Sequence, residues 1–392
     1  MEKVNLGVIG TGARAGLVRT MITDEKKRGD IVALCDVNPD HLSRFEKMVE
    51  TGLGHGTSNY SDYHDLLDDE KVDAVLISTP DFLHHEMAIE AFNAGKHVFL
   101  EKPVGINLEQ MIEIVRAAQN ADTILEIGYV LRYAPFFVGM KQLIDSGEIG
   151  TPLFAQALEE YYGAFHFYRG WWKSREHVGG IMIQKICHDM DLHYWFFGKP
   201  RKVVAFESLM DFKPGGWDSD ALNCDDCQNP CPYYTKAEGS RTGTNECVYN
   251  APHDISDNTQ ILVQFESGLN LSMGMNFFNA RGQSDRHWKV VGSKAELSGR
   301  LSTGMVRIDP RHDTNMQNTR YLKFTSGTGG HGGGDALQIL EFLDGILEGH
   351  EAKAGIESAY WSSILIMGAQ KSADEGEIVE IADLTRKYPF PG

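Results

Sequence analysis

Short apolar segments alternate with amphipathic segments through the first 130 residues of the chain. Between 40 and 50, and again between 109 and 119, apolar residues recur at three- and four-residue spacing, which predicts helices. Apolar runs bounded by turn residues predict strands at 4–10, 31–37, 73–79, 97–101 and 123–129. Because strands that alternate with helices form a parallel sheet covered by helices, we predict an α/β domain over residues 1–130.

The pattern changes after Gly150, and residues 131–392 are predicted to form a second α/β domain. Helical periodicity returns at 179–198, 335–348 and 356–373. Residues 211–256, rich in Cys, Asp, Asn, Gly and Pro, are predicted to be an irregular insertion. Longer strand-like segments joined by short turns predict an open, mostly antiparallel sheet; they lie at 151–162, 201–209, 259–278 and 287–301, with a hairpin turn at Ser267.

Composition and charge narrow the class of protein. Hydrophobic residues make up 42% and charged residues 23% of the chain, as in soluble globular proteins. The formal charge of −18, from 55 acidic against 37 basic residues, would repel nucleic acid and anionic lipid, so neither is an expected partner. No apolar run reaches the roughly 18 residues of a membrane span, and a strand beginning at Val4 leaves no room for a signal peptide. We expect a cytoplasmic protein.

A glycine-rich motif follows the first predicted strand. In "GVIGTGARAG", Gly10 permits a tight turn, Gly12 lets the backbone approach a pyrophosphate, and the small Ala15 allows helix and strand to pack. Amides at the start of the next helix, around Ala13 and Arg14, would face the phosphates. The motif lies inside a βαβ unit and predicts a dinucleotide-binding site; the alternative is an ordinary strand-to-helix turn.

The second predicted strand is followed by an acid, Asp36. A carboxylate at this place can accept hydrogen bonds from the adenosine ribose hydroxyls. It would also repel a 2′-phosphate, and the neighbouring Val37 and Asn38 offer no cation. The predicted cofactor is therefore NAD, in preference to NADP.

Several motifs together resemble the glucose-fructose oxidoreductase, inositol dehydrogenase and rhizopine-catabolism (Gfo/Idh/MocA) family over essentially the whole chain. They are "GVIGTG" (7–12), "ISTPDFLHHEMAIEAFNAGKHVFLEKPVG" (77–105), "GYVLRYAPFF" (128–137) and "GGIMIQKICHDMDLHYW" (179–195). The resemblance implies a Rossmann domain followed by an α/β domain whose open sheet commonly forms the interface of a homodimer or homotetramer. It also implies NAD(P)-dependent oxidation or reduction of sugars, polyols or related carbonyls.

The E-K-P tripeptide follows the strand at 97–101. The resemblance implies that Lys102 is catalytic, reaching both the nicotinamide ribose and the reacting hydroxyl, where a lysine in a cleft can stabilise an alkoxide or exchange a proton. The alternative is a lysine that extends to the surface from a strand end. The sequence does not decide whether Pro103 follows a cis peptide bond. Cofactor contacts are expected, on the same resemblance, from Thr79, Pro80, His84, Glu101 and Lys102.

The predicted helix 179–198 carries the second set of candidates. The resemblance implies that His188 is catalytic, as an acid/base or by orienting the substrate. The family frequently has an Asp four residues before this histidine, where this chain has Gln184, and "KICH" instead puts Lys185 one turn from His188. Lys185 and Asp191 are candidate substrate residues; Asp191 either orients His188 or has no such role.

Aromatic and polar residues crowd the stretch just before this helix. Sugar rings offer apolar C–H faces and many hydroxyls, so such side chains could stack on a substrate and bond to it. The alternative is that the aromatic rings pack an interface within the protein. The candidate substrate contacts are Tyr161, Tyr162, Arg169, Trp172 and Lys173.

A glycine-rich stretch at 329–338 contains His331 and Asp335 before a predicted helix. One interpretation is a loop that covers the substrate. The other is that Asp335 caps the helix.

Four cysteines cluster in the predicted insertion, as C-x2-C-x3-C-x15-C. Cys224, Cys227, Cys231 and Cys247 could hold a tetrahedral structural zinc ion, which suits a reducing compartment better than disulfides do. The spacing is not that of a familiar zinc module, so disulfides and free thiols remain alternatives.

Three functional classes fit these residues. The first is an NAD-dependent dehydrogenase or reductase that acts on a sugar, polyol or glycoside. The second is a glycosidase that uses bound NAD to oxidise a ring carbon transiently. The third is a non-catalytic dinucleotide sensor, which has little need of both Lys102 and His188.

Overall fold

The computed structural model describes residues 2–163, 165–240, 243–314, 317–325 and 330–391. The chain divides into two compact units. The first unit comprises Met1–Val138, Ser326–Ser363 and Tyr388–Gly392, and the second comprises Gly139–Thr325 and Ile364–Lys387. Each unit has its own sheet.

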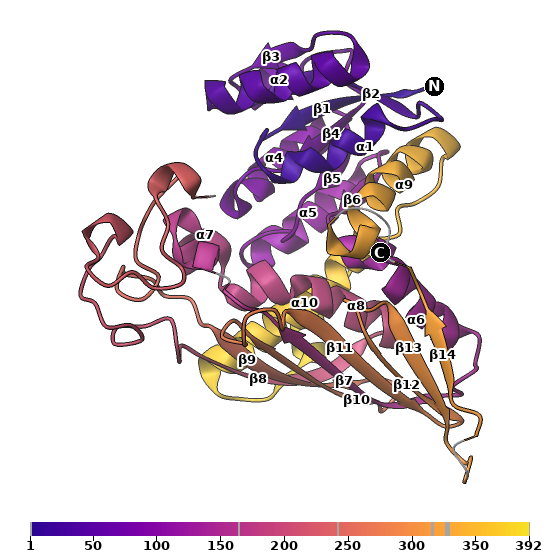
Figure 1. Ribbon diagram of the computed structural model, residues 1–392. Helices are drawn as coiled ribbons and strands as arrows, with labels where there is room; N and C mark the ends of the chain where they lie inside the picture. Colours follow the sequence, from indigo (N-terminus) through magenta and orange to yellow (C-terminus); the bar gives the residue numbers. More distant parts are fainter. Residues whose placement is uncertain (1, 164, 241–242, 315–316, 326–329, 392) are drawn as a thin grey trace. The chain divides into compact units, whose positions relative to one another are not determined.

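The first unit contains a parallel sheet of six strands in the order β3-β2-β1-β4-β5-β6 (Figure 1). This is the order of a Rossmann fold, so the predicted fold of the N-terminal part is confirmed. The strands are β1 (Val4–Ile9), β2 (Gly29–Cys35), β3 (Ser58–Tyr60), β4 (Ala74–Ile77), β5 (His97–Leu100) and β6 (Leu125–Ile127).

Helices of the first unit begin and end where local chemistry predicts. Asn38 caps α2 (Pro39–Leu53) by accepting from the backbone nitrogen of Asp40, and the left-handed Gly54 ends that helix. Asn107 caps α5 (Leu108–Asn120) in the same way. The other helices that lie wholly within the segment 2–138 are α1 (Arg19–Ile22), α3 (Tyr63–Leu67) and α4 (His84–Asn93).

A helix from far along the chain completes the core of the first unit. α9 (Gly334–Glu348) contributes Ile339, Phe342 and Leu343, all fully buried, to the cluster that also contains residues of β1, β2 and β4. The ring of Phe342 packs edge-on against Phe99 of β5, with 5.6 Å between the ring centres. The first unit is therefore discontinuous in sequence.

The second unit contains a sheet of nine strands in the order β14-β13-β12-β11-β7-β10-β9-β8-β15. Only the β7–β10 pair is parallel among these described strands. The predicted mostly antiparallel sheet is confirmed, including the β9–β10 hairpin at Ser267. The strands are β7 (Pro152–Glu160), β8 (Pro200–Ser208), β9 (Asn258–Phe265), β10 (Asn270–Asn276), β11 (Asp285–Gly292), β12 (Ala295–Arg300), β13 (Met305–Pro310), β14 (Arg320–Lys323) and β15 (Val379–Glu380).

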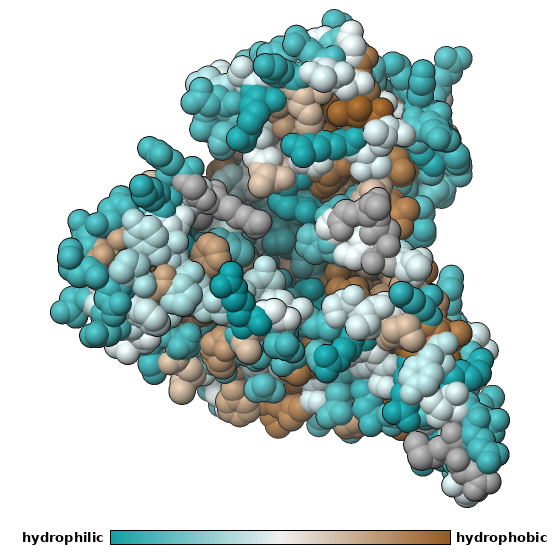
Figure 2. All heavy atoms as spheres, viewed as in Figure 1, coloured by the Kyte–Doolittle hydropathy of each residue, from teal (hydrophilic) through white to brown (hydrophobic). Residues whose placement is uncertain are grey.

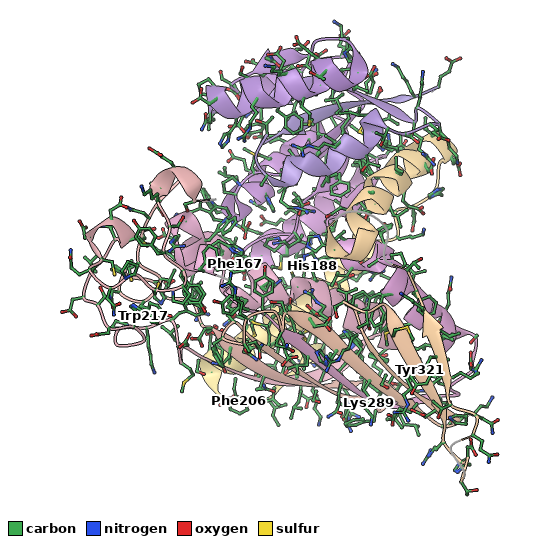
Figure 3. The ribbon with its side chains drawn as sticks, viewed as in Figure 1. Phe167, His188, Phe206, Trp217, Lys289 and Tyr321 are labelled. Atoms are coloured by element: carbon green, nitrogen blue, oxygen red, sulfur yellow. The ribbon has the colours of Figure 1, made fainter. Side chains whose placement is uncertain are left out.

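One face of this sheet is covered by helices and the other is open. Along β7, Ala155, Ala157 and Glu159 are buried whereas the residues between them are not, the two-residue alternation of a half-covered strand. α8 (Cys187–Phe197) lies on the covered side, and the C-terminal part of α10 (Ile356–Glu375) packs on β8. Phe206 and Lys289 extend from the opposite face (Figure 3). Hydrophobic side chains also gather over the lower edge of the second unit in Figure 2.

Further helices of the second unit are α7 (Arg175–Val178) and α11 (Ile381–Lys387), while α6 (Pro135–Asp145) contains the boundary after Val138. Within the insertion 211–256, the described residues form two short 3-10 turns, Cys224–Asp226 and Ala237–Gly239, and one isolated bridge between Asn223 and Glu246. Within the described segments, no helix has both the length and the apolar character needed to cross a membrane.

Candidate active site

The glycine turn after β1 has the geometry that the motif predicts. Gly10 has φ of 85°, and a Cβ atom there would lie 2.9 Å from the backbone of Ser78, so only glycine fits. A Cβ atom on Gly12 would meet nothing within 4 Å, which leaves its backbone open to a ligand. Ala15 is fully buried at the start of the 3-10 turn Arg14–Val18.

A cavity of about 220 Å³ adjoins this turn. Its lining combines residues of the glycine turn with charged and apolar side chains. The lining also includes two arginines that the sequence analysis did not identify, because they come from helices and not from the motif itself. The lining residues are Thr11, Gly12, Ala13, Gly16, Arg19, Arg44, Phe45 and Met48.

Asp36 lies beside Thr11. Its Oδ2 atom accepts from the backbone nitrogen of Thr11 at 2.7 Å and from the Thr11 hydroxyl at 2.9 Å, and its Oδ1 atom accepts from the nitrogen of Asn38 at 2.8 Å. A carboxylate oxygen has room for more than one donor. The side chain is therefore oriented and can still accept from a ribose hydroxyl.

Arg14 is engaged by two acids of the first unit. Its guanidinium donates to Oε1 of Glu101 at 2.6 and 2.9 Å, and to Oδ1 of Asp335 at 3.0 Å. Burial alone would raise the pKa of Asp335, but the bond from His331 and the charge of Arg14 lower it to about 2. The predicted phosphate contact of residue 14 is through its backbone amide and stays a prediction, while its side chain holds Glu101.

Asp335 does not cap α9. No side-chain hydrogen bond is present at the cap, which is Gly333. Asp335 instead lies in the first turn, 3.1 Å from the His331 ring and paired with Arg14. Gly329, the first residue of the glycine-rich stretch, lies outside the described residues, and the proposed covering of a substrate stays a prediction.

His84 lies between two backbone carbonyls. Expected to contact the cofactor, it is fully buried, with Nδ1 2.8 Å from the Pro103 carbonyl and Nε2 3.1 Å from the Thr79 carbonyl. Both ring nitrogens thus face backbone carbonyls, and the expected contact with the cofactor stays a prediction. His84 joins the loop of Thr79 and Pro80 to the E-K-P loop.

The E-K-P loop follows β5. Glu101 is 3% exposed and its Oε2 atom accepts from the Lys102 backbone nitrogen at 3.3 Å. The Lys102–Pro103 bond is cis, which answers the point that the sequence left open. Gly128 packs against this loop, because a Cβ atom there would lie 3.0 Å from the Glu101 carboxylate. The Lys102 side chain is half-buried.

The candidates on the predicted helix 179–198 lie in two different helical forms. Gln184 and Lys185 belong to a π-helical turn, Met182–Ile186, whereas His188 and Asp191 lie in α8. Single π-turns inside helices are frequent at functional sites, where they change the direction of nearby side chains. His188 is 4% exposed, and Asp191 is fully buried.

Lys185 is held by the second unit's sheet. Its ammonium lies 2.9 Å from Glu159 of β7 and 4.7 Å from the centre of the Tyr161 ring. Glu159 was not among the predicted site residues, because an acid in a strand of alternating polar and apolar residues is typical of the exposed face. Figure 3 shows His188 on the same covered side of the sheet.

The Arg169 side chain bonds to the insertion 211–256. Expected to contact substrate, it is 1% exposed and donates to the backbone carbonyls of Glu246 and Tyr233, each at 2.8 Å, and to the Cys224 sulfur at 3.6 Å. All three partners belong to the insertion. Arg169 therefore holds the insertion, and its expected contact with a substrate stays a prediction.

The other aromatic and polar candidates are only partly exposed. Trp172 packs against Phe167, with 5.7 Å between the rings, and Tyr161 packs against Phe277 at 6.1 Å. Lys173 pairs with Glu246, and Tyr162 approaches Tyr233 at 5.7 Å. Their substrate contacts stay predictions.

The cysteine cluster does not form the expected zinc site. Among the described residues, no three His, Cys, Asp or Glu side chains are grouped so that they could hold a metal ion. All six cysteines are free thiols. Burial and the nearby thiols of Cys224 and Cys247 raise the pKa of Cys231, while Cys227 donates to Ser219. The structure does not support the zinc expectation, because the described residues contain no group of three such ligands.

Two family models match nearly the whole chain. The model described as an oxidoreductase family with an NAD-binding Rossmann fold matches residues 4–129, and its companion, the C-terminal alpha/beta domain of the oxidoreductase family, matches residues 141–381. The chain belongs to the Gfo/Idh/MocA oxidoreductase family. The resemblance drawn from the motifs is confirmed.

Curated relatives of this Gfo/Idh/MocA protein include polyol dehydrogenases. Inositol 2-dehydrogenase of Salmonella typhimurium is 29% identical over 202 residues, which are 51% of this chain and 55% of the relative. The scyllo-inositol 2-dehydrogenase (NAD(+)) of Bacillus subtilis is 32% identical over 35% of this chain and 39% of its own. The chain thus spans about half or less of the length of these curated relatives.

A solved structure shares the fold of this family member over almost its full length. Levoglucosan dehydrogenase, in complex with NADH and levoglucosan, superimposes with a TM-score of 0.78 at 18% identity, covering 97% of this chain and 99% of its own. At that identity the likeness concerns the fold alone.

Proposed function

We propose that this protein is an NAD-dependent oxidoreductase that transfers a hydride between nicotinamide and a hydroxyl or carbonyl carbon of a sugar, polyol or glycoside. The observation that carries the proposal is Asp36, oriented by Thr11 beside an open glycine turn, in a chain that also has the E-K-P loop. The names of the curated relatives support the substrate class.

In this proposal, separate residues bind the cofactor, take part in catalysis and contact the substrate. Gly10 and Gly12 admit the pyrophosphate backbone, and Asp36 accepts from the adenosine ribose. The bound nicotinamide supplies the hydride chemistry. Lys102 donates a hydrogen bond to the substrate oxygen and stabilises negative charge that develops there, and His188 exchanges the proton. Tyr161, Trp172, Lys185 and Asp191 are the proposed substrate contacts.

NAD is the proposed cofactor and NADP the weaker one. Asp36 places negative charge where a 2′-phosphate would lie, which favours NAD. Arg19 and Arg44 line the neighbouring cavity and supply the opposite charge, so the preference rests on which of these groups faces the ribose.

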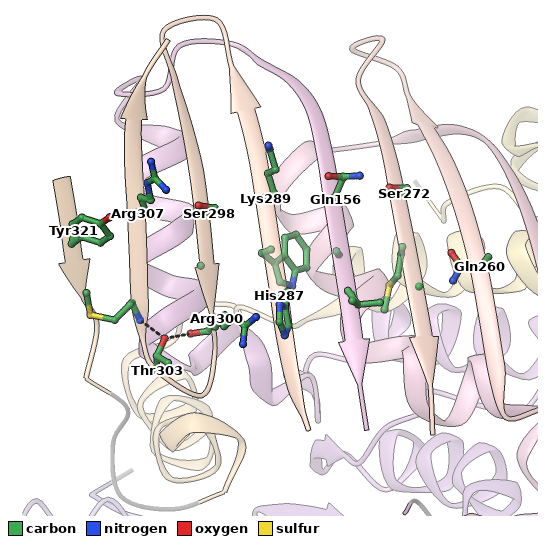
Figure 4. A pocket seen from close by; sticks show the side chains of 17 residues that line it. Gln156, Gln260, Ser272, His287, Lys289, Ser298, Arg300, Thr303, Arg307 and Tyr321 are labelled. Carbon is green, nitrogen blue, oxygen red and sulfur yellow. Dashed lines mark hydrogen bonds between the residues drawn. The ribbon is translucent and has the colours of Figure 1, made fainter. Parts of the chain in front are cut away.

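The open face of the nine-stranded sheet is the proposed interface of a homodimer or homotetramer. Phe206 is 67% and Leu262 56% exposed on this face, which is unusual for large apolar side chains. Beside them lies a groove of about 620 Å³ lined by polar side chains from seven strands, among them Gln156, Lys289 and Arg307 (Figure 4).

A cytoplasmic location is also proposed, because free thiols suit a reducing compartment.

A panel of sugars, inositols, glycosides and 3-keto sugars, scored by nicotinamide absorbance alongside product analysis, tests the proposal. Steady NADH formation with a polyol or sugar is the expected result. Release of a sugar without net NADH would favour the glycosidase class instead. Dinucleotide binding with no turnover of any compound would favour the sensor class.

A further inference from the structure

Four charged side chains meet on the covered face of the nine-stranded sheet, where the neighbouring positions are apolar. Glu159 of β7 and Arg286 of β11 are directly opposite each other in the antiparallel register, and Glu159 and Asp189 are each 1% exposed. Ala157 and Trp288, the next inward-facing residues on the same two strands, are apolar and buried. Charges in such a place are costly unless each is compensated.

The buried charges of these four side chains are compensated mainly by one another. Arg286 donates to both oxygens of Asp189, at 3.0 and 3.2 Å, and lies 2.6 Å from Glu159. Lys185 adds the fourth charge, with its ammonium 2.9 Å from the same Glu159 oxygen. Two carboxylates and two cations balance, so the network can be buried.

Lys185 completes the charge balance of the network, but it differs from the other three members in its position and exposure. The Glu159–Arg286 pair already joins two neighbouring strands with opposite charges, and the third member, Asp189, joins α8 to them. Lys185 instead comes from the π-helical turn, and its side chain retains 15% exposure. Its ammonium carries three N–H groups, forms an ion pair with Glu159, and also lies over the Tyr161 ring.

Burial raises the pKa of Asp189 to about 7, with the nearby Glu159 charge acting in the same direction and Arg286 opposing both. The charges of Arg286 and Lys185 overcome burial and lower the pKa of Glu159. Glu159 is therefore the more acidic of the two carboxylates, and it is the one that Lys185 contacts.

We propose that Glu159 and Arg286 are positioning residues for the proposed reaction: the carboxylate of Glu159, fixed by Arg286, aims the Lys185 ammonium so that a remaining N–H group donates to an oxygen of the sugar or polyol substrate. This inference rests on the proposed function. It gives the K-I-C-H motif a defined role, in which Lys185 is a hydrogen-bond donor to the substrate and its partner is on β7, not on its own helix.

A double-mutant cycle tests the inference. Glu159→Gln keeps the size of the side chain and removes its charge, and Lys185→Met removes the ammonium. Each single variant is expected to raise KM for the polyol about tenfold while KM for NAD changes less than about twofold. The double variant is expected to be no worse than Lys185→Met, because Glu159 acts only through Lys185.

The matched control is Glu207→Gln. Glu207 is a half-buried acid of β8 in the same sheet, paired with Arg175 and bonded to Ser256, and far in the strand order from β7 and β11. Its replacement is expected to leave the polyol KM unchanged. Losses that multiply in the double variant, or an unchanged polyol KM in Glu159→Gln, would overturn the inference.

Misfolding of a variant and failure of the proposed function can each be distinguished from failure of this inference. If Glu159→Gln does not fold, the Lys185→Met variant tests the inference. A network with a purely structural role predicts that this variant has a lower melting temperature and an unchanged KM for the polyol. If the wild-type protein turns over no compound of the panel, the proposed function has failed, and the crystal structure of Glu159→Gln then tests the positioning alone. A Lys185 ammonium that stays over the Tyr161 ring in that variant would contradict it.

Discussion

Thr11 donates two hydrogen bonds to one carboxylate oxygen of Asp36, from its backbone nitrogen at 2.7 Å and from its hydroxyl at 2.9 Å. The acid that should select the dinucleotide is therefore oriented by the glycine turn that should hold the pyrophosphate. Two parts of one predicted site are joined in a single contact, so a change in either should alter the other.

Thr11→Val is expected to weaken NAD binding several-fold, because it removes one of the bonds that orient Asp36 while keeping the shape of residue 11. Asp36→Ala should lose the preference for NAD over NADP, since the repulsion of a 2′-phosphate is gone. Fluorescence titration with NAD and with NADP measures the two dissociation constants. Thr57→Val, on a half-buried threonine outside the glycine turn, is the control. Tighter wild-type binding of NADP than of NAD would contradict the assignment.

Lys102→Ala is expected to lower turnover at least about 100-fold, because the variant lacks the group that stabilises charge on the substrate oxygen. NAD binding should stay detectable, since the glycine turn and Asp36 are intact. Steady-state rates with the best compound of the panel and NAD titration measure the two effects. Lys71→Ala, an exposed lysine of the same unit, is the control. Near-normal turnover would remove Lys102 from catalysis.

Glu126 should make the protein less stable as the pH rises. Burial raises its pKa to about 8, against donors from Gln338 and Tyr133 that favour the charged form. The folded state keeps a proton that the unfolded chain releases near its ordinary pKa of 4.5. The free energy of unfolding should therefore decrease as the pH rises from 4.5 to about 8, by up to about 1.4 kcal/mol per pH unit.

Glu126→Gln, which mimics the protonated acid, should flatten this dependence. Urea unfolding at about pH 5 and at about pH 8, the ends of the window, measures the slope. Glu86→Gln, on the exposed surface of α4, should keep the wild-type slope. An unchanged slope in Glu126→Gln would mean that the carboxyl group is ionised throughout.

Arg169→Met should loosen the insertion 211–256. The variant loses two hydrogen bonds to backbone carbonyls, and leaving these buried acceptors unpaired costs about 2 kcal/mol or more. Limited proteolysis followed by mass spectrometry should show faster cleavage within the insertion, with NAD affinity unchanged. Arg201→Met, an exposed arginine of β8, should behave as wild type. Equal cleavage rates would show that other contacts hold the segment.

Leu262→Asp should dissociate the proposed oligomer, because it places a charge among the exposed apolar side chains of the open sheet face. Light scattering and sedimentation measure the mass in solution. Ile378→Asp, which changes an equally exposed apolar residue outside the strands, is the control. A wild-type monomer would reject this face as the interface.

Residues whose role follows from a local pattern were predictable. Gly10 needs a positive φ because it ends a strand in a tight turn, and the five strands of the first half are marked by apolar runs, so both follow from sequence. The roles of Arg14 and Arg169 were not predictable. Arg14 pairs with Asp335, 321 positions away, and Arg169 bonds to Glu246, 77 positions away. Nothing in the local pattern encodes such partners.

Short and edge elements were also missed. The strand β3 has three residues, and β15 has two, too few for a two-residue alternation to stand out. The π-helical turn at Met182–Ile186 escaped notice because its sequence has the apolar spacing of an ordinary helix.

The place of Phe342 in the core of the first unit bears on how the chain is made. Synthesis releases β1 to β6 long before α9, so the emerging sheet exposes the apolar surface around Phe99 until more than two hundred further residues have been added. Until then the exposed apolar surface can associate with other chains. A ribosome that stalls after β14 would therefore leave an aggregation-prone fragment. Chaperone capture during translation is the expected safeguard.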